Sequence, residues 1–176
     1  MLSPLWAGEV GRATSEYLAP FILPTAKPGN PQVERGRYLV TLGQCHDCHT
    51  PKGAGGRPQL DRLLSGHPEG LAPAPAVQDA ISITPTLTSF TGPWGTSFTR
   101  NLTPDEETGI GKWTEQDFLK VLRTGIRKNG AAVLPPMPWE YLTQLTDEDL
   151  KAMFAYLRSI PPLKNRVPEN LPPQRR

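Results

Sequence analysis

Apolar residues recur at helical spacing in three stretches of this 176-residue chain. The first stretch begins at Asn30-Pro31, where an asparagine suited to capping a helix precedes a proline suited to the first helical position. It ends before Gly43, and its apolar face consists of Val33, Gly36, Leu39 and Val40. Glycine inside a helix costs about 1 kcal/mol relative to alanine, so Gly36 indicates a close approach by another helix.

The other two stretches lie in the last third of the chain, and each opens with the same capping pattern. Thr114 begins Thr-Glu-Gln-Asp and Thr146 begins Thr-Asp-Glu-Asp. The apolar residue before each cap, Trp113 or Leu145, is expected to pack onto the first turn of its own helix. The predicted apolar stripes are Phe118, Val121, Leu122 and Ile126 in one helix, and Leu150, Met153, Phe154, Leu157 and Ile160 in the other.

Residues 51–112 are rich in proline and glycine, which predicts a long loop section. Short helical turns are expected over residues 60–64 and 76–83, and no stretch gives a strong strand signal. Regular elements supply too few apolar side chains for so long a loop section, so a large apolar cofactor is expected in the interior. The prediction is a mainly α fold with long loops: an N-terminal arm over 1–30, one domain over 31–168 and a tail over 169–176.

The composition narrows the classes of function. Lys plus Arg total 19 and Asp plus Glu 17, and a formal net charge of +2 is no signature of nucleic-acid binding. No apolar run approaches the ~18 residues of a membrane span. The first residues also lack the basic head and apolar core of a secretory leader.

Cysteine and histidine are concentrated in one turn, Cys45-His46-Asp47-Cys48-His49. This turn holds the only two cysteines of the chain and two of its three histidines. Three chemistries use such a cluster: a redox dithiol, a zinc site, and c-type haem, in which two thiols form thioether bonds and the next histidine binds iron. A dithiol would need a βαβ setting, which the pattern lacks. A zinc site would combine Cys45, Cys48, His49 and His67, without a second ligand pair at finger-like spacing. The Cys-x-x-Cys-His spacing therefore favours covalent haem.

An electron-carrying iron bound by His49 needs a second axial ligand. The segment Pro136-Met137-Pro138 cannot be helical, because its prolines fix φ and remove backbone donors. A stiff loop of this kind suits a thioether ligand, so Met137 is the expected ligand and His67 the alternative. Met153 is expected in the core, and His46 is expected to point away from the ring.

The assembled pattern resembles a class I cytochrome c. In that fold a first helix leads into the haem motif and a C-terminal helix crosses it, with Gly36 and Tyr156-Leu157 at the crossing here. Over roughly residues 32–168 the chain resembles the haem domains of cytochrome subunits of bacterial membrane-bound alcohol and gluconate dehydrogenases. The matching motifs are Asn101-Leu102-Thr103-Pro104-Asp105, Thr108-Gly109-Ile110-Gly111, Trp113-Thr114 and Pro136-Met137-Pro138. Those subunits carry three haem motifs and a membrane anchor, whereas this sequence has one motif, so only the domain type is carried over.

The resemblance implies roles for individual residues. Cys45 and Cys48 would hold one haem c, with His49 and Met137 as its axial ligands. Residues that would contact the ring or its propionates are Asn101, Trp113, Trp94 and Arg100. The acidic turn Asp105-Glu106-Glu107 is expected to be solvated rather than to bind calcium.

Two functions remain open at this point. One is an electron carrier, not itself an enzyme, whose His/Met ligation raises the reduction potential; the other is a haem enzyme or small-ligand sensor with a labile distal position. No distal acid–base constellation is recognisable, which favours the carrier. Its expected partner is a dehydrogenase or respiratory complex, with the arm over 1–30 as a means of docking to a membrane complex. The expected location is the periplasm or the outer face of the bacterial inner membrane, after removal of an export leader. The run Lys120, Arg123, Arg127 and Lys128 would be a solvated helix face or would steer an acidic partner.

Overall fold

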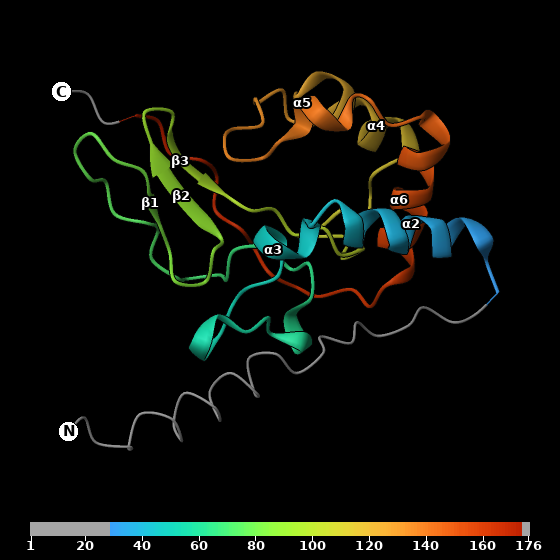
Figure 1. Ribbon diagram of the computed structural model, residues 1–176, viewed down its shortest axis with the longest axis horizontal. Helices are drawn as coiled ribbons and strands as arrows, with labels where there is room; N and C mark the ends of the chain where they lie inside the picture. Colours follow the sequence, from blue (N-terminus) through green and yellow to red (C-terminus); the bar gives the residue numbers. More distant parts are fainter. Residues whose placement is uncertain (1–28, 174–176) are drawn as a thin grey trace, which may run out of the picture.

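A computed structural model describes residues 29–173 of the chain (Figure 1). The arm predicted over 1–30 therefore falls almost entirely outside the described residues. None of the helices between residues 29 and 173 combines the length and the apolar character of a membrane span. The elements, in order, are α2 (Pro31–Leu42), α3 (Cys45–His49), the short 3-10 helices η1 (Ala54–Gly56) and η2 (Leu60–Arg62), β1 (Ser82–Ile83), β2 (Ser89–Gly92), β3 (Gly95–Phe98), α4 (Glu115–Thr124), α5 (Trp139–Leu142) and α6 (Asp147–Ser159).

Helix α2 begins where the sequence predicts. The side-chain oxygen of Asn30 accepts hydrogen bonds from the backbone N–H groups of Gln32 (3.0 Å) and Val33 (3.4 Å). These bonds satisfy donors that have no partner within the first turn of a helix. After the helix ends, Gln44 adopts the left-handed conformation (φ 56°) and turns the chain into α3. The cap and this turn together fix where α3 starts.

Helices α2 and α6 cross in close contact at Gly36, as predicted (Figure 1). A Cβ atom at Gly36 would lie 1.9 Å from the backbone oxygen of Ala152 and 2.8 Å from Cβ of Tyr156. Tyr156 and Leu157, the pair that the resemblance places at this crossing, are both buried. Only a hydrogen atom fits between the two helices at this point.

Both predicted helix caps in the last third of the chain are confirmed. The Thr114 hydroxyl accepts from the Asp117 N–H (3.1 Å), and the Asp117 carboxylate accepts from the Thr114 N–H (2.9 Å). The Thr146 hydroxyl accepts from the Asp149 N–H at 3.1 Å. Helices α4 and α6 therefore start at positions that local hydrogen bonding determines.

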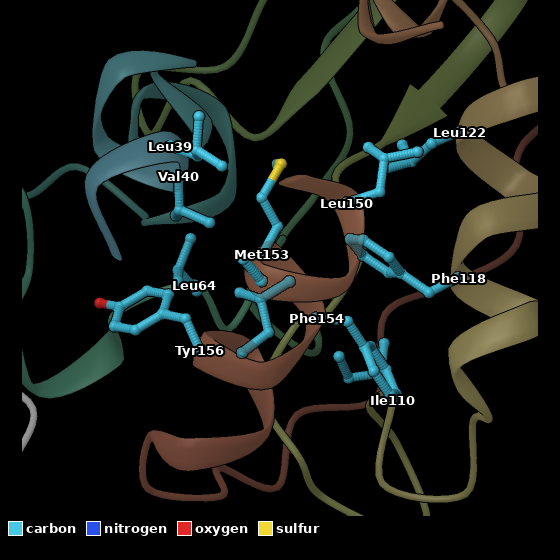
Figure 2. Packing of buried hydrophobic residues seen from close by; sticks show 12 residues of the cluster. Leu39, Val40, Leu64, Ile110, Phe118, Leu122, Leu150, Met153, Phe154 and Tyr156 are labelled. Atoms are coloured by element: carbon cyan, nitrogen blue, oxygen red, sulfur yellow. The ribbon is translucent and has the colours of Figure 1, made fainter. Parts of the chain in front are cut away.

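Helices α2, α4 and α6 enclose one apolar core (Figure 2). Met153 lies inside it as predicted, and Trp113 and Leu145, which precede the two caps, pack against it. The prediction for Ile126 is wrong: it follows the left-handed Gly125 that ends α4, and its side chain is exposed. The buried members of the core are Leu39, Val40, Leu64, Ile110, Phe118, Leu122, Leu150, Ala152, Met153, Phe154, Tyr156 and Leu157.

Residues 82–98 form a small antiparallel sheet that the sequence reading missed. Its strand order is β1-β2-β3, and Phe90 lies opposite Ser97 in the β2–β3 pair. The helical turn expected over 76–83 is absent, because residues 82–83 belong to β1, whereas η2 confirms the turn expected over 60–64. The strands are four residues or shorter, and their buried positions include Ser89, Thr91, Thr96 and Ser97. Apolar alternation, the usual strand signal, is therefore missing.

Residues 169–171 return to the body of the protein. Leu171 and Thr96 exchange two backbone hydrogen bonds of 2.9 Å each, and Asn170 accepts a 2.8 Å hydrogen bond from the Arg100 guanidinium. The domain boundary at residue 168 stays a prediction, and these contacts show that the segment after it packs onto β3.

Candidate functional site

The turn α3 carries both cysteines and His49 on one short helix. Both thiols are free and partly buried. Burial raises the pKa of the Cys45 thiol to about 11 and also raises the pKa of Cys48. Redox-active dithiols usually have a lowered thiol pKa, so these two cysteines do not have the character of such a site.

His49 is buried and makes one short hydrogen bond: its Nδ1 lies 2.7 Å from the backbone oxygen of Arg100. A carbonyl oxygen only accepts, so Nδ1 carries the proton and the lone pair lies on Nε2. Burial lowers the pKa of His49 to about 4, which keeps the ring neutral near pH 7. Histidines that bind metals are held in this way, with one ring nitrogen donating to a carbonyl and the other free to ligate.

A buried lysine that sequence reasoning did not single out lies at the C-terminal end of α3. Lys52 Nζ donates to the carbonyl oxygens of His46 (2.8 Å) and Thr50 (3.2 Å). A cation is favourable at the C-terminus of a helix, where the carbonyls lack partners within the helix. The Thr50 hydroxyl lies 3.0 Å from His46 Nδ1 and accepts from the Leu64 N–H at the same distance. These bonds hold the back of the cysteine–histidine turn.

The structure places His67 away from a ligand role. Its Nδ1 lies 2.9 Å from the Thr88 hydroxyl and its Nε2 lies 3.1 Å from the Leu71 oxygen. The ring also packs against Phe98, with 4.9 Å between ring centroids. Both nitrogens are thus bound to protein groups, which removes the fourth ligand that the zinc hypothesis needed. Across residues 29–173, no group of three or more Cys, His, Asp and Glu side chains is arranged to hold a metal ion.

The acidic turn over residues 105–107 is held by its own hydrogen bonds. The Asp105 carboxylate accepts from the backbone N–H of Thr108 (2.7 Å), from the Thr108 hydroxyl (2.6 Å) and from the Glu107 N–H (3.2 Å). The Glu107 carboxylate pairs with Lys164 at 2.8 Å. These bonds fit the solvated turn that the sequence favoured over a calcium site.

Met137 lies in the loop between α4 and α5. Its side chain is half-buried and packs against the apolar core. The loop is fastened to β3, because the Ser97 hydroxyl donates a 2.6 Å hydrogen bond to the Pro135 oxygen. This bond anchors the backbone at Pro135, two residues before Met137.

Asn101 is buried, and its amide is engaged by the protein itself. The nitrogen donates to the Leu163 oxygen (2.8 Å) and to the Thr108 hydroxyl (3.2 Å). The oxygen accepts from the Thr103 N–H (3.0 Å) and hydroxyl (2.8 Å). Asn101 thus ties three segments together directly after the residue that holds His49.

A cavity of about 320 Å³ lies beside these residues. Arg100, Asn101 and Trp113, three residues singled out from the sequence, line it together with Arg127. Burial, together with the nearby Arg127 cation, lowers the pKa of Arg100 to about 10. Trp94 is not part of this cavity, because it stands in the β2–β3 turn, at the far end of β3 from Arg100.

The four basic residues over 120–128 do not form one exposed basic face. Arg123 donates to the Leu145 oxygen and to the Asp147 carboxylate, both at 2.6 Å. Lys128 pairs with Asp117 at 2.7 Å, and Arg127 pairs with Glu169 at 3.0 Å. Three of these four cations are thus distributed among separate ion pairs.

A sequence model of the cytochrome c family matches residues 33–161, a range that contains α3, the cavity residues up to Asn129 and all of α6. The chain belongs to the cytochrome c family. Cytochromes of this family carry c-type haem, which requires two thiols at this spacing and a ligating histidine directly after the second. The free thiols of α3 and the lone pair on His49 Nε2 fit those requirements.

The relatives of this cytochrome include subunits of bacterial dehydrogenases. It is 35% identical over 142 residues to the cytochrome c subunit of a quinone-dependent alcohol dehydrogenase from Gluconobacter oxydans, covering 78% of this chain and 24% of that one. It is 35% identical over 132 residues to a fructose dehydrogenase cytochrome subunit from Gluconobacter japonicus, covering 75% and 22%. It is 34% identical over 128 residues to a gluconate 2-dehydrogenase cytochrome c subunit from Pantoea cypripedii, covering 70% and 22%. The matched region thus spans about a quarter of these relatives.

Proposed function

We propose that this chain transfers electrons through a single covalently bound c-type haem. Cys45 and Cys48 would form the thioether bonds, with His49 and Met137 as the axial ligands. The observation that carries the proposal is the 2.7 Å hydrogen bond from His49 Nδ1 to the Arg100 oxygen. It fixes the tautomer that iron binding needs, and it does so directly after two free thiols.

The bound haem would supply one-electron iron chemistry. The residues of the chain would hold it and set its potential. The carbonyl of Arg100 orients the His49 ring. Hydrogen bonds of Lys52 and Thr50 hold the C-terminal end of α3 in place. A thioether from Met137 would raise the reduction potential relative to a second histidine. The apolar core packs against Cys45 and Met137 and would keep water away from them.

We infer that the protein acts as an electron carrier for a dehydrogenase or respiratory complex, in the periplasm or at the outer face of the inner membrane. Support comes from relatives that are themselves cytochrome subunits of dehydrogenases. Docking through the arm over 1–30 belongs to the same proposal.

The test is an absorption spectrum of protein exported by a host that attaches c-type haem. We expect colour that stays with the denatured chain after solvent extraction, and a weak long-wavelength band of methionine sulfur bound to ferric iron. Met137→Leu should abolish that band. Met153→Leu is the matched control, because Met153 lies in the apolar core, and it should leave the band unchanged.

The opposite results would overturn the proposal at distinct points. Haem that extracts into solvent would exclude covalent attachment. A band that survives Met137→Leu would exclude Met137 as the ligand. Rapid binding of carbon monoxide by the reduced wild-type protein would indicate a labile distal position, and with it a haem enzyme or sensor instead of a carrier.

A further inference from the structure

We infer that Arg127 and Arg100 together bind the propionate carboxylates of the haem, and that Glu169 competes for the same two guanidinium groups. The inference rests on the proposed function. Arg127 stands in a run of basic residues that sequence reasoning took for an exposed helix face. The structure instead gives it a mostly buried position in the cavity beside Arg100.

The hydrogen bonding of Arg127 points to an anionic ligand. Only 12% of its side chain is exposed, and its Nη2 pairs with the Glu169 carboxylate at 3.0 Å. Its Nε is buried and has no hydrogen-bond partner within the described part of the chain. A buried cationic N–H without an acceptor is unfavourable, so a carboxylate oxygen at this position would stabilise the site.

The two guanidinium groups already share one carboxylate. Glu169 lies 3.0 Å from Arg127 Nη2 and 3.7 Å from Arg100 Nη1, so its two oxygens face the two arginines. The Glu169 side chain is 68% exposed, which makes its hold on the pair weak and easily displaced. The pair is thus shaped to receive carboxylates, and Glu169 occupies it from the solvent side.

The charge of the cavity matches a ligand with two carboxylates. Its ionisable lining consists of Arg100, Arg127, Lys128 and Arg166 against Glu107 and Glu169, which leaves a net charge of +2. A haem has two propionates, each with one negative charge. Planar guanidinium groups bind carboxylates through paired hydrogen bonds, which a lysine cannot form.

The position of the cavity relative to His49 supports the same assignment. Arg100 holds His49 through its backbone oxygen and lines the cavity with its side chain. The residue that orients His49 is therefore also part of the basic cavity, which would place positive charge near a haem bound by His49. Cations near a haem stabilise its ferrous state, which carries one positive charge fewer than the ferric state. The Glu169 carboxylate would have the opposite effect.

The consequence is a pair of opposite shifts in reduction potential. Arg127→Gln should favour the ferric form by about tenfold in the ferric/ferrous equilibrium, which corresponds to about 59 mV for one electron. Glu169→Gln should favour the ferrous form by about threefold, a smaller effect because the carboxylate is screened by water. Loss of a structural side chain would not produce shifts of opposite sign.

The experiment is spectroelectrochemical titration of the holoprotein, combined with resonance Raman spectra of the propionate bending band. Lys151→Gln is the matched control. It also removes one positive charge, but Lys151 lies on α6 outside the cavity and pairs with Glu115 at 3.8 Å. We expect it to leave the band in place and to shift the potential far less than Arg127→Gln. If Arg127→Gln does not fold, Arg127→Lys keeps the charge but should still displace the Raman band.

Equal shifts for Arg127→Gln and Lys151→Gln, or an unmoved Raman band in the Arg127 variants, would overturn the inference. A Glu169→Gln potential equal to wild type would overturn the competition by Glu169. These results differ from failure of the proposed function, which would appear in the wild-type protein as missing covalent haem or a missing methionine band.

Discussion

His49 and Arg100 lie 51 residues apart in sequence, and they are joined by a 2.7 Å hydrogen bond from the imidazole to a main-chain oxygen. Because the acceptor belongs to the backbone, a side-chain substitution at position 100 does not remove it. The backbone oxygen of Arg100 thus orients His49, whereas its guanidinium group supplies positive charge near the site.

This separation predicts the outcome of Arg100→Gln. The variant should keep the covalent haem and the methionine band, because the carbonyl that orients His49 remains. Its reduction potential should fall, because one largely buried cation is lost. Absorption spectra and a redox titration measure the two effects, and a high-spin spectrum in this variant would contradict the assignment.

Gly36→Ala should destabilise the protein through the α2–α6 crossing. The new methyl group would lie 1.9 Å from the Ala152 oxygen, so one helix must move. We expect a loss of about 1–3 kcal/mol in the free energy of unfolding, measured by denaturant titration. Gly53→Ala is the control. Gly53 has φ −96°, and a Cβ there would lie 3.4 Å from its nearest neighbour, the Gln59 side chain, so stability should change by no more than about 0.5 kcal/mol. Equal losses at both sites would contradict the crossing as the cause.

Asn101→Ala should act on stability and leave ligation intact. It removes acceptors and donors for Thr103, Thr108 and Leu163 and leaves buried polar groups unpaired. A loss of about 2–4 kcal/mol in the free energy of unfolding is expected. The methionine band should persist in the folded fraction. Asn129→Ala, at an exposed turn with one hydrogen bond to Ala131, should cost well under half as much.

Asp117 predicts a specific dependence of stability on pH. Hydrogen bonds from Lys128 and from the Thr114 N–H lower the pKa of Asp117 from 3.8 to about 2. A lowered carboxyl pKa stabilises the folded state above pH 4, and this contribution disappears as the pH falls through about 2. Wild type should therefore have a higher melting temperature than Asp117→Asn at pH 6, and the two values should converge between pH 4 and pH 2. Parallel curves over that range would show that the carboxylate contributes no such linkage.

The features that sequence predicted are those with local causes. The three helix caps are hydrogen bonds between a side chain and a backbone group within three residues, so a short stretch of sequence is enough to predict them. They are formed by Asn30, Thr114 and Thr146. The haem motif is equally local. Gly36 indicated that another helix approaches, because glycine has no other advantage inside a helix.

The features that sequence missed depend on partners far along the chain. Nothing near Arg127 indicates that its counter-ion stands at position 169, and nothing near Lys52 indicates that it will be buried against α3. The sheet was missed for another reason: its buried positions carry Ser and Thr, whose hydroxyls are satisfied by hydrogen bonds such as the 2.8 Å pair between Thr91 and Thr96. Hydrophobic periodicity is silent for a polar interior of that kind.

The bonds around Gly66 have a consequence for how the fold can vary. Gly66 N–H donates to the His49 oxygen and His67 N–H donates to the Thr99 oxygen, so the chain leaves and rejoins the helical body at adjacent points. Residues 67–98, which include the sheet, thus form a long connection whose two ends are joined by a backbone hydrogen bond. The entropy cost of closing such a connection grows only slowly with its length. The exposed residues 75–81 can therefore be lengthened or replaced, whereas Ser97 has to stay in place because it holds the loop before Met137.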